Sequence, residues 1–228
     1  MVRSPGLTQA RFRYQCEYAD MKNKFFYTAL ASILLLLCVH YLDIPLAMWI
    51  AENLGLYAPH LKTSNIPDTL FLMVVLFSSL SWSAYFYLMR SNIHDGRILF
   101  FRLIGTVLPL SFVLKILLKW IFGRIDTRLW LAYPNYHDEF HWFAGVGGFQ
   151  GFPSGHTLVF TPLLMALWQF YPRYRFYYVL LWMILCIALI ITEYHFLADV
   201  LAGTLIGGVL YKLVLARLGH LALVQNKP

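Results

Sequence analysis

The heptapeptide GFPSGHT, residues 151–157, stands where a polar loop turns into an apolar helical segment. Proline favours the start of a helix, serine is a preferred N-cap, and glycine lets a ligand approach the backbone closely. The free amides of a first helical turn bind anions, phosphate above all. A histidine in the same turn, His156, can pass a proton to the bound group. The heptapeptide therefore predicts either a phosphate site or a plain helix cap.

The composition is that of a membrane protein. Of the 228 residues, 60% are hydrophobic and only 13% are charged, against roughly 25% charged in soluble domains. These values exclude a disordered chain and argue against a nucleic-acid partner, although the formal net charge is +7. The cysteines Cys16, Cys38 and Cys186 are far apart and two lie in apolar runs, so no disulfide framework is expected.

Six apolar segments are long enough, or nearly so, to cross a bilayer core that needs roughly 20 helical residues. They cover residues 25–42, 69–89, 98–118, 154–170, 176–191 and 200–218. The fourth and fifth are short and would borrow flanking aromatic residues at the interface. The sequence thus predicts an all-α fold, a polytopic membrane bundle of six transmembrane helices.

The expected domain organisation is simple. Residues 1–24 are polar and basic and would form a cytoplasmic segment. The apolar run after them has no small-residue cleavage site, so the first span is expected to be retained. Residues 25–218 would form one membrane domain, with an extracytoplasmic active-site loop at 119–150, and 219–228 a cytoplasmic tail. We expect 43–45 (DIP) to end the first span, and 47–56 to be an interfacial segment anchored by Trp49 or a short connecting helix.

Basic residues set the expected orientation in the cell membrane. Most of the 18 lysines and arginines fall in the N-terminal segment, the loops after the second and fourth spans, and the C-terminal end. Both termini are therefore predicted to be cytoplasmic, and the loops after spans one, three and five extracytoplasmic. The basic residues predicted on the outer side are Lys62, Lys115, Lys119, Arg124 and Arg128.

Three polar clusters would share this outer face. They are Lys119 with Arg124 and Arg128; Ser154, Gly155 and His156; and His195 with Asp199. Ionisable residues at a membrane boundary are costly unless they are paired, so their convergence predicts a functional site.

The pair His195 and Asp199 carries the most chemistry. The four-residue spacing places them on one face if the helix begins before His195. An aspartate bound to one imidazole nitrogen fixes the tautomer and leaves the other nitrogen as a nucleophile, and His156 would then be the acid towards the leaving oxygen. Two histidines, a carboxylate and several cations suit attack on a phosphate. Taken alone, a His-x-x-x-Asp pair is more often structural.

Together these residues resemble the type 2 phosphatidic acid phosphatase superfamily of membrane lipid phosphatases. That family's signature is a lysine followed by Arg-Pro, then Pro-Ser-Gly-His, then an arginine with a downstream histidine and aspartate. The middle part is complete at 153–156, the third is kept in HFLADVLAG at 195–203, and the first in Lys119 and the Gly-Arg pair at 123–124. The order, the spacing and the six-span layout match over roughly residues 25–208.

The resemblance implies hydrolysis of a lipid phosphate or pyrophosphate monoester at the outer face through a phosphohistidine. His195 would be the nucleophile, Asp199 would orient it, and His156 would protonate the leaving group. Lys119, Ser154 and the Gly155 amide would hold phosphate oxygens, with no metal and no other cofactor.

Two cations of the family pattern are missing. Asp126 occupies the position of the first-part arginine, and Leu189 occupies the position of the third-part arginine. Arg124 and Arg128 flank Asp126 and are the candidates to supply positive charge to the phosphate. Asp126 itself could repel phosphate or bind a substrate amine.

Two further patterns have two interpretations each. The segment HDEFH, residues 137–141, has histidines four apart as in metal sites, but it lacks the glutamate of a zinc protease helix, so a solvated or headgroup-contacting loop is favoured. Gly203 and Gly207 form a small-x-x-x-small face that suits packing inside the bundle, with a homodimer as the alternative.

Two alternatives to a phosphatase stay open. A lipid phosphotransferase would use the same intermediate with another lipid as acceptor. A non-catalytic lipid-binding or transport protein would keep the fold without the reaction, and the residues at 126 and 189 are the features that favour it.

Overall fold

The computed structural model describes residues 21–54, 69–92, 95–133, 140–144 and 147–225. The elements in chain order are α2 (Met21–Leu37), η1 (Cys38–Leu42), α3 (Asp43–Leu54), α4 (Thr69–Arg90), α5 (Gly96–Phe122), α6 (Thr127–Ala132), α7 (Gly155–Phe170), η2 (Pro172–Tyr174), α8 (Arg175–Ile191) and α9 (Leu197–Gln225). In these ranges no strand occurs, and Arg124 and Phe140 form only an isolated bridge. The all-α prediction is confirmed.

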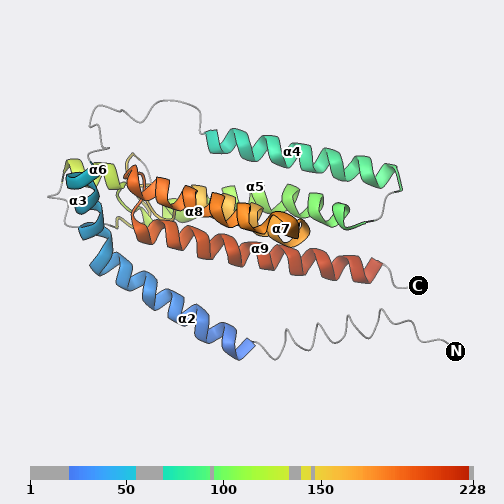
Figure 1. Ribbon diagram of the computed structural model, residues 1–228, viewed down its shortest axis with the longest axis horizontal. Coiled ribbons are helices and arrows are strands. Elements are labelled where there is room, and N and C mark those ends of the chain that lie inside the picture. Colours follow the sequence, from blue (N-terminus) through green and yellow to red (C-terminus); the bar gives the residue numbers. More distant parts are fainter. Residues whose placement is uncertain (1–20, 55–68, 93–94, 134–139, 145–146, 226–228) are drawn as a thin grey trace.

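Long helices run side by side along the molecule (Figure 1). Five are long and apolar enough to cross a membrane: Ala29–Leu54, Thr69–Arg90, Gly96–Phe122, Pro172–Ile191 and Leu197–Gly219. The remaining predicted span is α7, which has only 16 residues, or about 24 Å at the helical rise. The polytopic membrane bundle is therefore confirmed, with five long spans and the shorter α7 standing for the predicted six.

The helix α7 lies between α5 and α9 and holds the bundle together. Its Val159 and Ala166 pack with Leu103 and Val107 of α5 and with Tyr211 of α9, and all of these side chains are buried. Because α7 starts at the predicted phosphate motif, this apolar packing fixes the motif relative to α5 and α9.

The small-x-x-x-small face of α9 packs inside the bundle. A Cβ on Gly203 would collide with the Thr157 hydroxyl and the Ser154 carbonyl, and one on Gly207 would lie 2.7 Å from the Leu158 carbonyl. The absence of side chains lets the backbones of α7 and α9 meet closely.

The first span does not end at residues 43–45, contrary to the prediction. The helix α2 continues through the π-helical turn η1 directly into α3, and Figure 1 shows the chain bending at this junction so that α3 reaches α6. Pro45 has no N–H to donate to the preceding turn of this continuous helix, and both a proline and a π-helical turn are common causes of a bend. The expected interfacial segment is thus helical up to Leu54.

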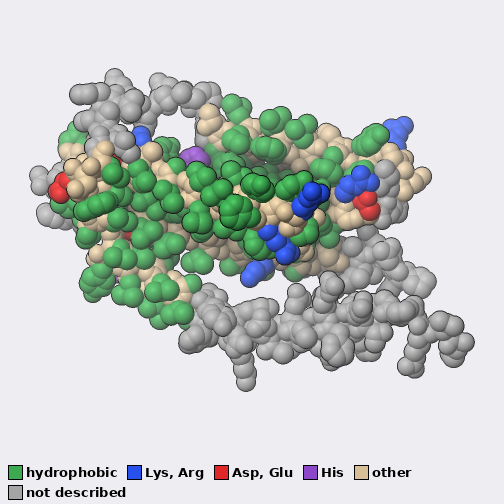
Figure 2. All heavy atoms as spheres, in the orientation of Figure 1, with side chains coloured by type: hydrophobic (Ala, Val, Ile, Leu, Met, Phe, Trp, Pro, Cys, Tyr) green, Lys and Arg blue, Asp and Glu red, His purple; other side chains and the backbone are tan. Residues whose placement is uncertain are grey.

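Hydrophobic side chains cover most of the visible surface, whereas Lys and Arg side chains gather mainly towards the end opposite α3 and α6 (Figure 2). The exposed side chains of α4 include Phe71, Leu76 and Phe86. Such a surface suits lipid, and the segregated cations agree with a transmembrane arrangement. The orientation across the bilayer and the cytoplasmic location of the termini stay predictions. So do the domain limits at residues 24 and 218.

Candidate active site

The motif at 153–156 forms the entry to α7. The helix begins at Gly155 and Ser154 occupies the N-cap position, but its side chain makes no capping hydrogen bond. The hydroxyl is fully buried and has no partner among the described residues. The interpretation of Ser154 as a plain cap is therefore wrong, because its oxygen leaves the helix end unsatisfied. A buried hydroxyl without a partner is unusual, and this one lies at the helix start, where a bound group could accept its hydrogen bond.

His195 lies in the turn between α8 and α9, directly beside Asp199. The His195 Nδ1 is 3.7 Å from the Asp199 Oδ2, longer than a hydrogen bond but within reach of a charge contact. The two residues are close, as expected, but they do not share a helix face, because α9 begins only at Leu197, after His195. The same Oδ2 accepts the Phe196 N–H at 3.0 Å, so Asp199 folds back to cap its own helix and thereby meets His195.

The two histidines of the motifs face each other. The ring centroids of His156 and His195 are 6.3 Å apart, and the Tyr194 ring contacts both. A hydrogen bond from the Ser154 N–H to the Asp199 carbonyl, 3.0 Å long, joins the two helix ends that carry them. At this separation both imidazoles can reach one phosphoryl group.

Burial controls the charge of His195. The residue is 3% exposed, and desolvation lowers the pKa of its imidazole below the usual 6.5, an effect that the nearby Lys119 reinforces and Asp199 opposes. The imidazole is therefore neutral near pH 7, the state that a nucleophile requires. Neither ring nitrogen meets hydrogen-bond geometry with a described residue, although Asp199 and the Gly151 backbone lie close enough to favour the protonated ring.

Asp126 stands beside Lys119 at the position of a missing family arginine. Burial raises the pKa of Asp126 to about 6, although Lys119 and the Gln150 N–H favour its ionised form. Lys119, in the last turn of α5, thus lies near both Asp126 and His195. Lys119 thus lies at the histidine site together with an acid, Asp126, that would compete with a phosphate for the lysine.

Arg124 is completely buried and binds two carboxylates. Its NH1 donates to the Asp199 Oδ1 at 2.7 Å, and its NH2 to the Asp43 Oδ2 at 2.8 Å. The guanidinium also lies over the Phe196 ring, 4.4 Å from its centroid. Asp43 was missed as a site residue because it stood in the segment interpreted as a helix break. The signal was there: an acid inside an apolar run is unusual in a membrane protein.

Arg128 is occupied elsewhere. Its NH2 and Nε donate to the Thr192 carbonyl at 2.8 and 3.2 Å, and the guanidinium lies over the Tyr194 ring. It therefore braces the turn that carries His195. The phosphate-binding roles of Arg124 and Arg128 stay predictions.

Glu193 is a second buried acid that the sequence interpretation passed over. It is 1% exposed, and both of its carboxyl oxygens lack a hydrogen-bond partner among the described residues. Burial raises its pKa, and Arg128 opposes that rise. Leu189, at the position of the other missing arginine, is buried in α8.

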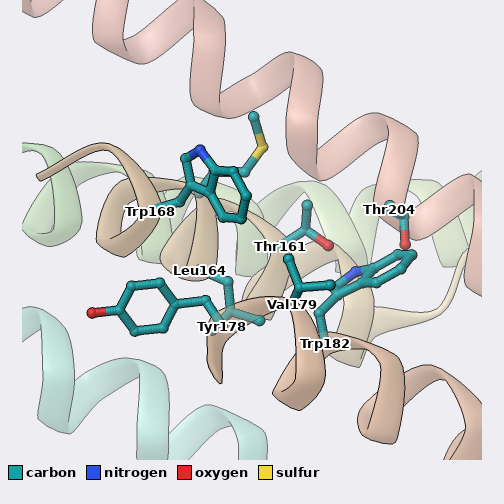
Figure 3. Close-up of a pocket in the computed structure, with 8 residues that line it drawn as sticks. Thr161, Leu164, Trp168, Tyr178, Val179, Trp182 and Thr204 are labelled. Atoms are coloured by element: carbon teal, nitrogen blue, oxygen red, sulfur yellow. The ribbon is translucent and has the colours of Figure 1, made fainter. Parts of the chain in front are cut away.

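Two other features lie outside this cluster. A cavity of about 170 Å³ between α7, α8 and α9 is lined mainly by apolar side chains such as Leu164, Trp168 and Val179 (Figure 3), so it is not the reaction site. In the segment HDEFH, residues 137–139 lie outside the described residues, whereas the His141 ring packs on Phe149. No group of three or more His, Cys, Asp or Glu side chains suited to a metal ion occurs among the residues that the structure describes.

Residues 98–220, more than half of the chain, match the model of the PAP2 superfamily. The chain belongs to the PAP2 superfamily. The sequence resemblance is thereby confirmed, and the matched region contains Lys119, Ser154, His156, His195 and Asp199 but not Asp43.

One curated relative of this PAP2 protein is a lipid A 1-phosphatase of Rhizobium etli, strain CFN 42. It is 31% identical over 123 residues, which are 51% of this chain and 50% of the relative. The chain therefore spans about half the length of the curated relative that it matches. No solved structure matches the chain.

Proposed function

We propose that this PAP2 protein is a membrane phosphatase that hydrolyses a lipid phosphate or pyrophosphate monoester. The observation that carries the proposal is the set of buried polar atoms at the joined ends of α7 and α9. The Ser154 hydroxyl and the His195 Nε2 have no hydrogen-bond partner among the described residues, the His195 Nδ1 lies 3.7 Å from Asp199, and the His156 ring is 6.3 Å from the His195 ring. Unsatisfied buried polar groups that converge on one point are expected to be satisfied by substrate.

The first step is attack by His195. Its Nε2 lone pair forms a bond to phosphorus while the bond from phosphorus to the leaving oxygen breaks, and His156 gives that oxygen its proton. The Nδ1–H is then directed at Asp199, which stabilises the positive charge that forms on the imidazole. Burial keeps His195 neutral before the attack, as the chemistry needs.

The second step is hydrolysis of the phosphohistidine. His156, now neutral, takes a proton from a water molecule whose oxygen attacks phosphorus. The bond from phosphorus to Nε2 breaks, and inorganic phosphate leaves. Lys119, the Ser154 hydroxyl and the Gly155 amide at the start of α7 hold the phosphoryl oxygens in both steps.

We further propose that the reaction uses no metal ion and takes place at the extracytoplasmic face. The name of the relative favours a lipid substrate, and the apolar surface of the bundle would give lipid access to the site from the bilayer. Among lipid phosphates, undecaprenyl pyrophosphate, phosphatidylglycerol phosphate, phosphatidic acid and a lipid A phosphate are the substrates to compare.

The test is release of inorganic phosphate from these four lipids in detergent mixed micelles by the purified full-length protein, with and without EDTA. We expect release that EDTA does not change, and no release above background from His195→Ala at equal expression. A short reaction stopped in alkali should yield a phosphorylated protein that loses its label in acid, as phosphohistidine does.

The alternatives give other outcomes. Transfer of labelled phosphate to a second lipid, without free phosphate, would identify a phosphotransferase. Binding of all four lipids without turnover by the wild type would identify a non-catalytic relative, for which the acid at Asp126 and the absence of an arginine at 189 are the supporting observations.

A further inference from the structure

A buried chain of charges links the first membrane helix to the nucleophile. Arg124 lies between two carboxylates, that of Asp43 at 2.8 Å and that of Asp199 at 2.7 Å, and all three side chains have no exposed surface. Asp199 in turn lies 3.7 Å from His195. A buried ion is strongly destabilising unless it is paired. With Asp43 and Asp199 both ionised, the two carboxylates together carry one negative charge more than Arg124 neutralises.

Asp43 also holds the start of α9 directly. Its Oδ1 accepts the Ala198 N–H at 2.9 Å, in the first turn of that helix. Asp199 accepts the Phe196 N–H of the same turn at 3.0 Å. Two carboxylates, one from the first span and one from α9 itself, thus satisfy the free amides next to His195.

The packing leaves no room for these groups to rearrange. The Arg124 guanidinium lies over the Phe196 ring at 4.4 Å and the Phe140 ring at 5.1 Å. The Asp43 carboxyl is fully buried, and both of its oxygens already accept hydrogen bonds, one from Arg124 and one from the Ala198 N–H. Any effect of Asp43 on the reaction therefore passes through Arg124 and α9.

We propose that Asp43 is a positioning residue of the PAP2 site, supplied by a helix outside residues 98–220, the region that matches the family model. By balancing Arg124, it leaves the Asp199 carboxylate free to act on His195 instead of being neutralised by the guanidinium. This inference rests on the proposed phosphatase function. It also gives the first span a role in the reaction, because the junction of η1 and α3 delivers the carboxylate.

The charge argument predicts opposite effects for the two partners. The groups near His195 are Asp199 from α9, Lys119 from α5, His156 from α7 and, in the same turn, Glu193. Asp43→Asn leaves Arg124 with one counter-charge, so the surroundings become more positive and the pKa of His195 falls. Arg124→Gln removes the cation, so the pKa of His195 rises. A purely structural role would not move it in two directions.

The experiment compares the pH dependence of kcat/KM for phosphatidic acid in mixed micelles. Relative to wild type, we expect the acidic limb to move by roughly half to one pH unit, to lower pH in Asp43→Asn and to higher pH in Arg124→Gln. The double variant should return close to the wild-type position. The ionisation of the substrate is common to all variants and cancels.

For Asp43→Asn, kcat should fall roughly tenfold, as for other groups that orient a functional imidazole, with KM little changed.

Asp95→Asn is the matched control. Asp95 also accepts a backbone N–H from the first turn of a helix, that of Arg97 at 2.9 Å, but it lies at the start of α5 and is exposed. The acidic limb of the pH profile of kcat/KM should be the same for Asp95→Asn as for wild type. An equal shift in Asp95→Asn, or unmoved limbs in both Asp43→Asn and Arg124→Gln, would overturn the proposal.

An NMR titration of His195 in labelled protein separates this inference from the proposed function. If the wild type released no phosphate, the proposed function would fail. Opposite shifts of the His195 pKa in the two variants would still support the electrostatic effect of Asp43 on His195. If His195→Ala abolishes turnover but the titration is the same in every variant, the function stands and the role of Asp43 is lost. Should Asp43→Asn fail to fold, the His195 titrations of Arg124→Gln and of the double variant decide: a raised pKa in the first that returns close to the wild-type value in the second supports the proposal.

Discussion

The backbone N–H of Ser154 donates a hydrogen bond to the carbonyl of Asp199, 3.0 Å away. This bond joins the start of α7 to the first turn of α9, so two motifs some forty residues apart in sequence become one site. The close approach that makes it available is set by Gly203, one turn further along α9.

Gly203→Ala should therefore separate the two helix ends. The new Cβ would collide with the Thr157 hydroxyl and with the Ser154 carbonyl, which is backbone and cannot rotate away. We expect a loss of about 1–3 kcal/mol in the free energy of unfolding and a loss of most activity. Thermal unfolding in detergent and phosphate release measure the two effects.

Gly208→Ala is the control for that substitution. Its nearest neighbour would be the Met165 sulfur at 3.6 Å, an ordinary contact. Its unfolding temperature and activity should match those of wild type. Equal effects at the two glycines would mean that a loss of helix flexibility, and not the contact with α7, limits the protein.

His156→Ala should lose activity in a manner that depends on the leaving group. A lipid alkoxide needs a proton from His156, so its release should slow by about 10²–10⁴-fold. The nitrophenolate of p-nitrophenyl phosphate leaves without one, so the initial burst of nitrophenolate that accompanies phosphorylation of His195 should be slowed much less, provided wild type turns this compound over. The later hydrolysis, in which His156 is the base, should slow for both substrates. Equal slowing of the phosphorylation step with both substrates would contradict the assignment of His156 as the acid.

The pKa of His195 should lie below that of an exposed histidine. Burial lowers it, so the imidazole stays neutral as the pH falls below 6.5. The folded state then binds fewer protons than the unfolded state, and the free energy of unfolding decreases once the pH drops below 6.5. NMR titration of labelled protein, with His195→Gln to assign the signal, measures the value. A midpoint at or above 6.5 would contradict this prediction.

Asp126→Asn should stabilise the protein near neutral pH. The pKa of Asp126 is raised from 3.8 to about 6 by burial, so the folded state holds the proton more tightly than the unfolded state. Below pH 3.8 the Asp126 carboxyl does not lower the free energy of unfolding. The loss of free energy grows between pH 3.8 and about pH 6 and is constant above pH 6. We expect a gain of roughly 1–3 kcal/mol at pH 7.5 and almost none at pH 4, measured by thermal unfolding in detergent.

The same variant also tests what Asp126 does to substrate. Removal of the negative charge leaves Lys119 to bind phosphate alone, so KM for phosphatidic acid should fall. For a lipid phosphate that carries an amine, KM should rise if Asp126 binds the amine. An unchanged KM for both lipids would place Asp126 outside the substrate site.

The sequence predicted the elements better than their junctions. Long apolar runs predicted the helices because a membrane-spanning segment must satisfy its backbone internally. The break at residues 43–45 was predicted from Asp and Pro, yet both are accommodated at the start of α3. Asp43 is tolerated there because Arg124, 81 residues away along the chain, neutralises it, a pairing that no local pattern reveals.

By itself, the sequence determined the helical membrane bundle, the superfamily and the candidate residues for the chemistry, since apolar length and motif order are local properties of the chain. Only the tertiary structure decided which of these groups are paired with one another and which are not. Ser154 leaves its own helix uncapped, Arg128 binds the Thr192 carbonyl, and Arg124 lies between Asp43 and Asp199. These outcomes depend on burial and on distances between helices, because a charge with no water around it binds whichever opposite charge the fold brings within reach.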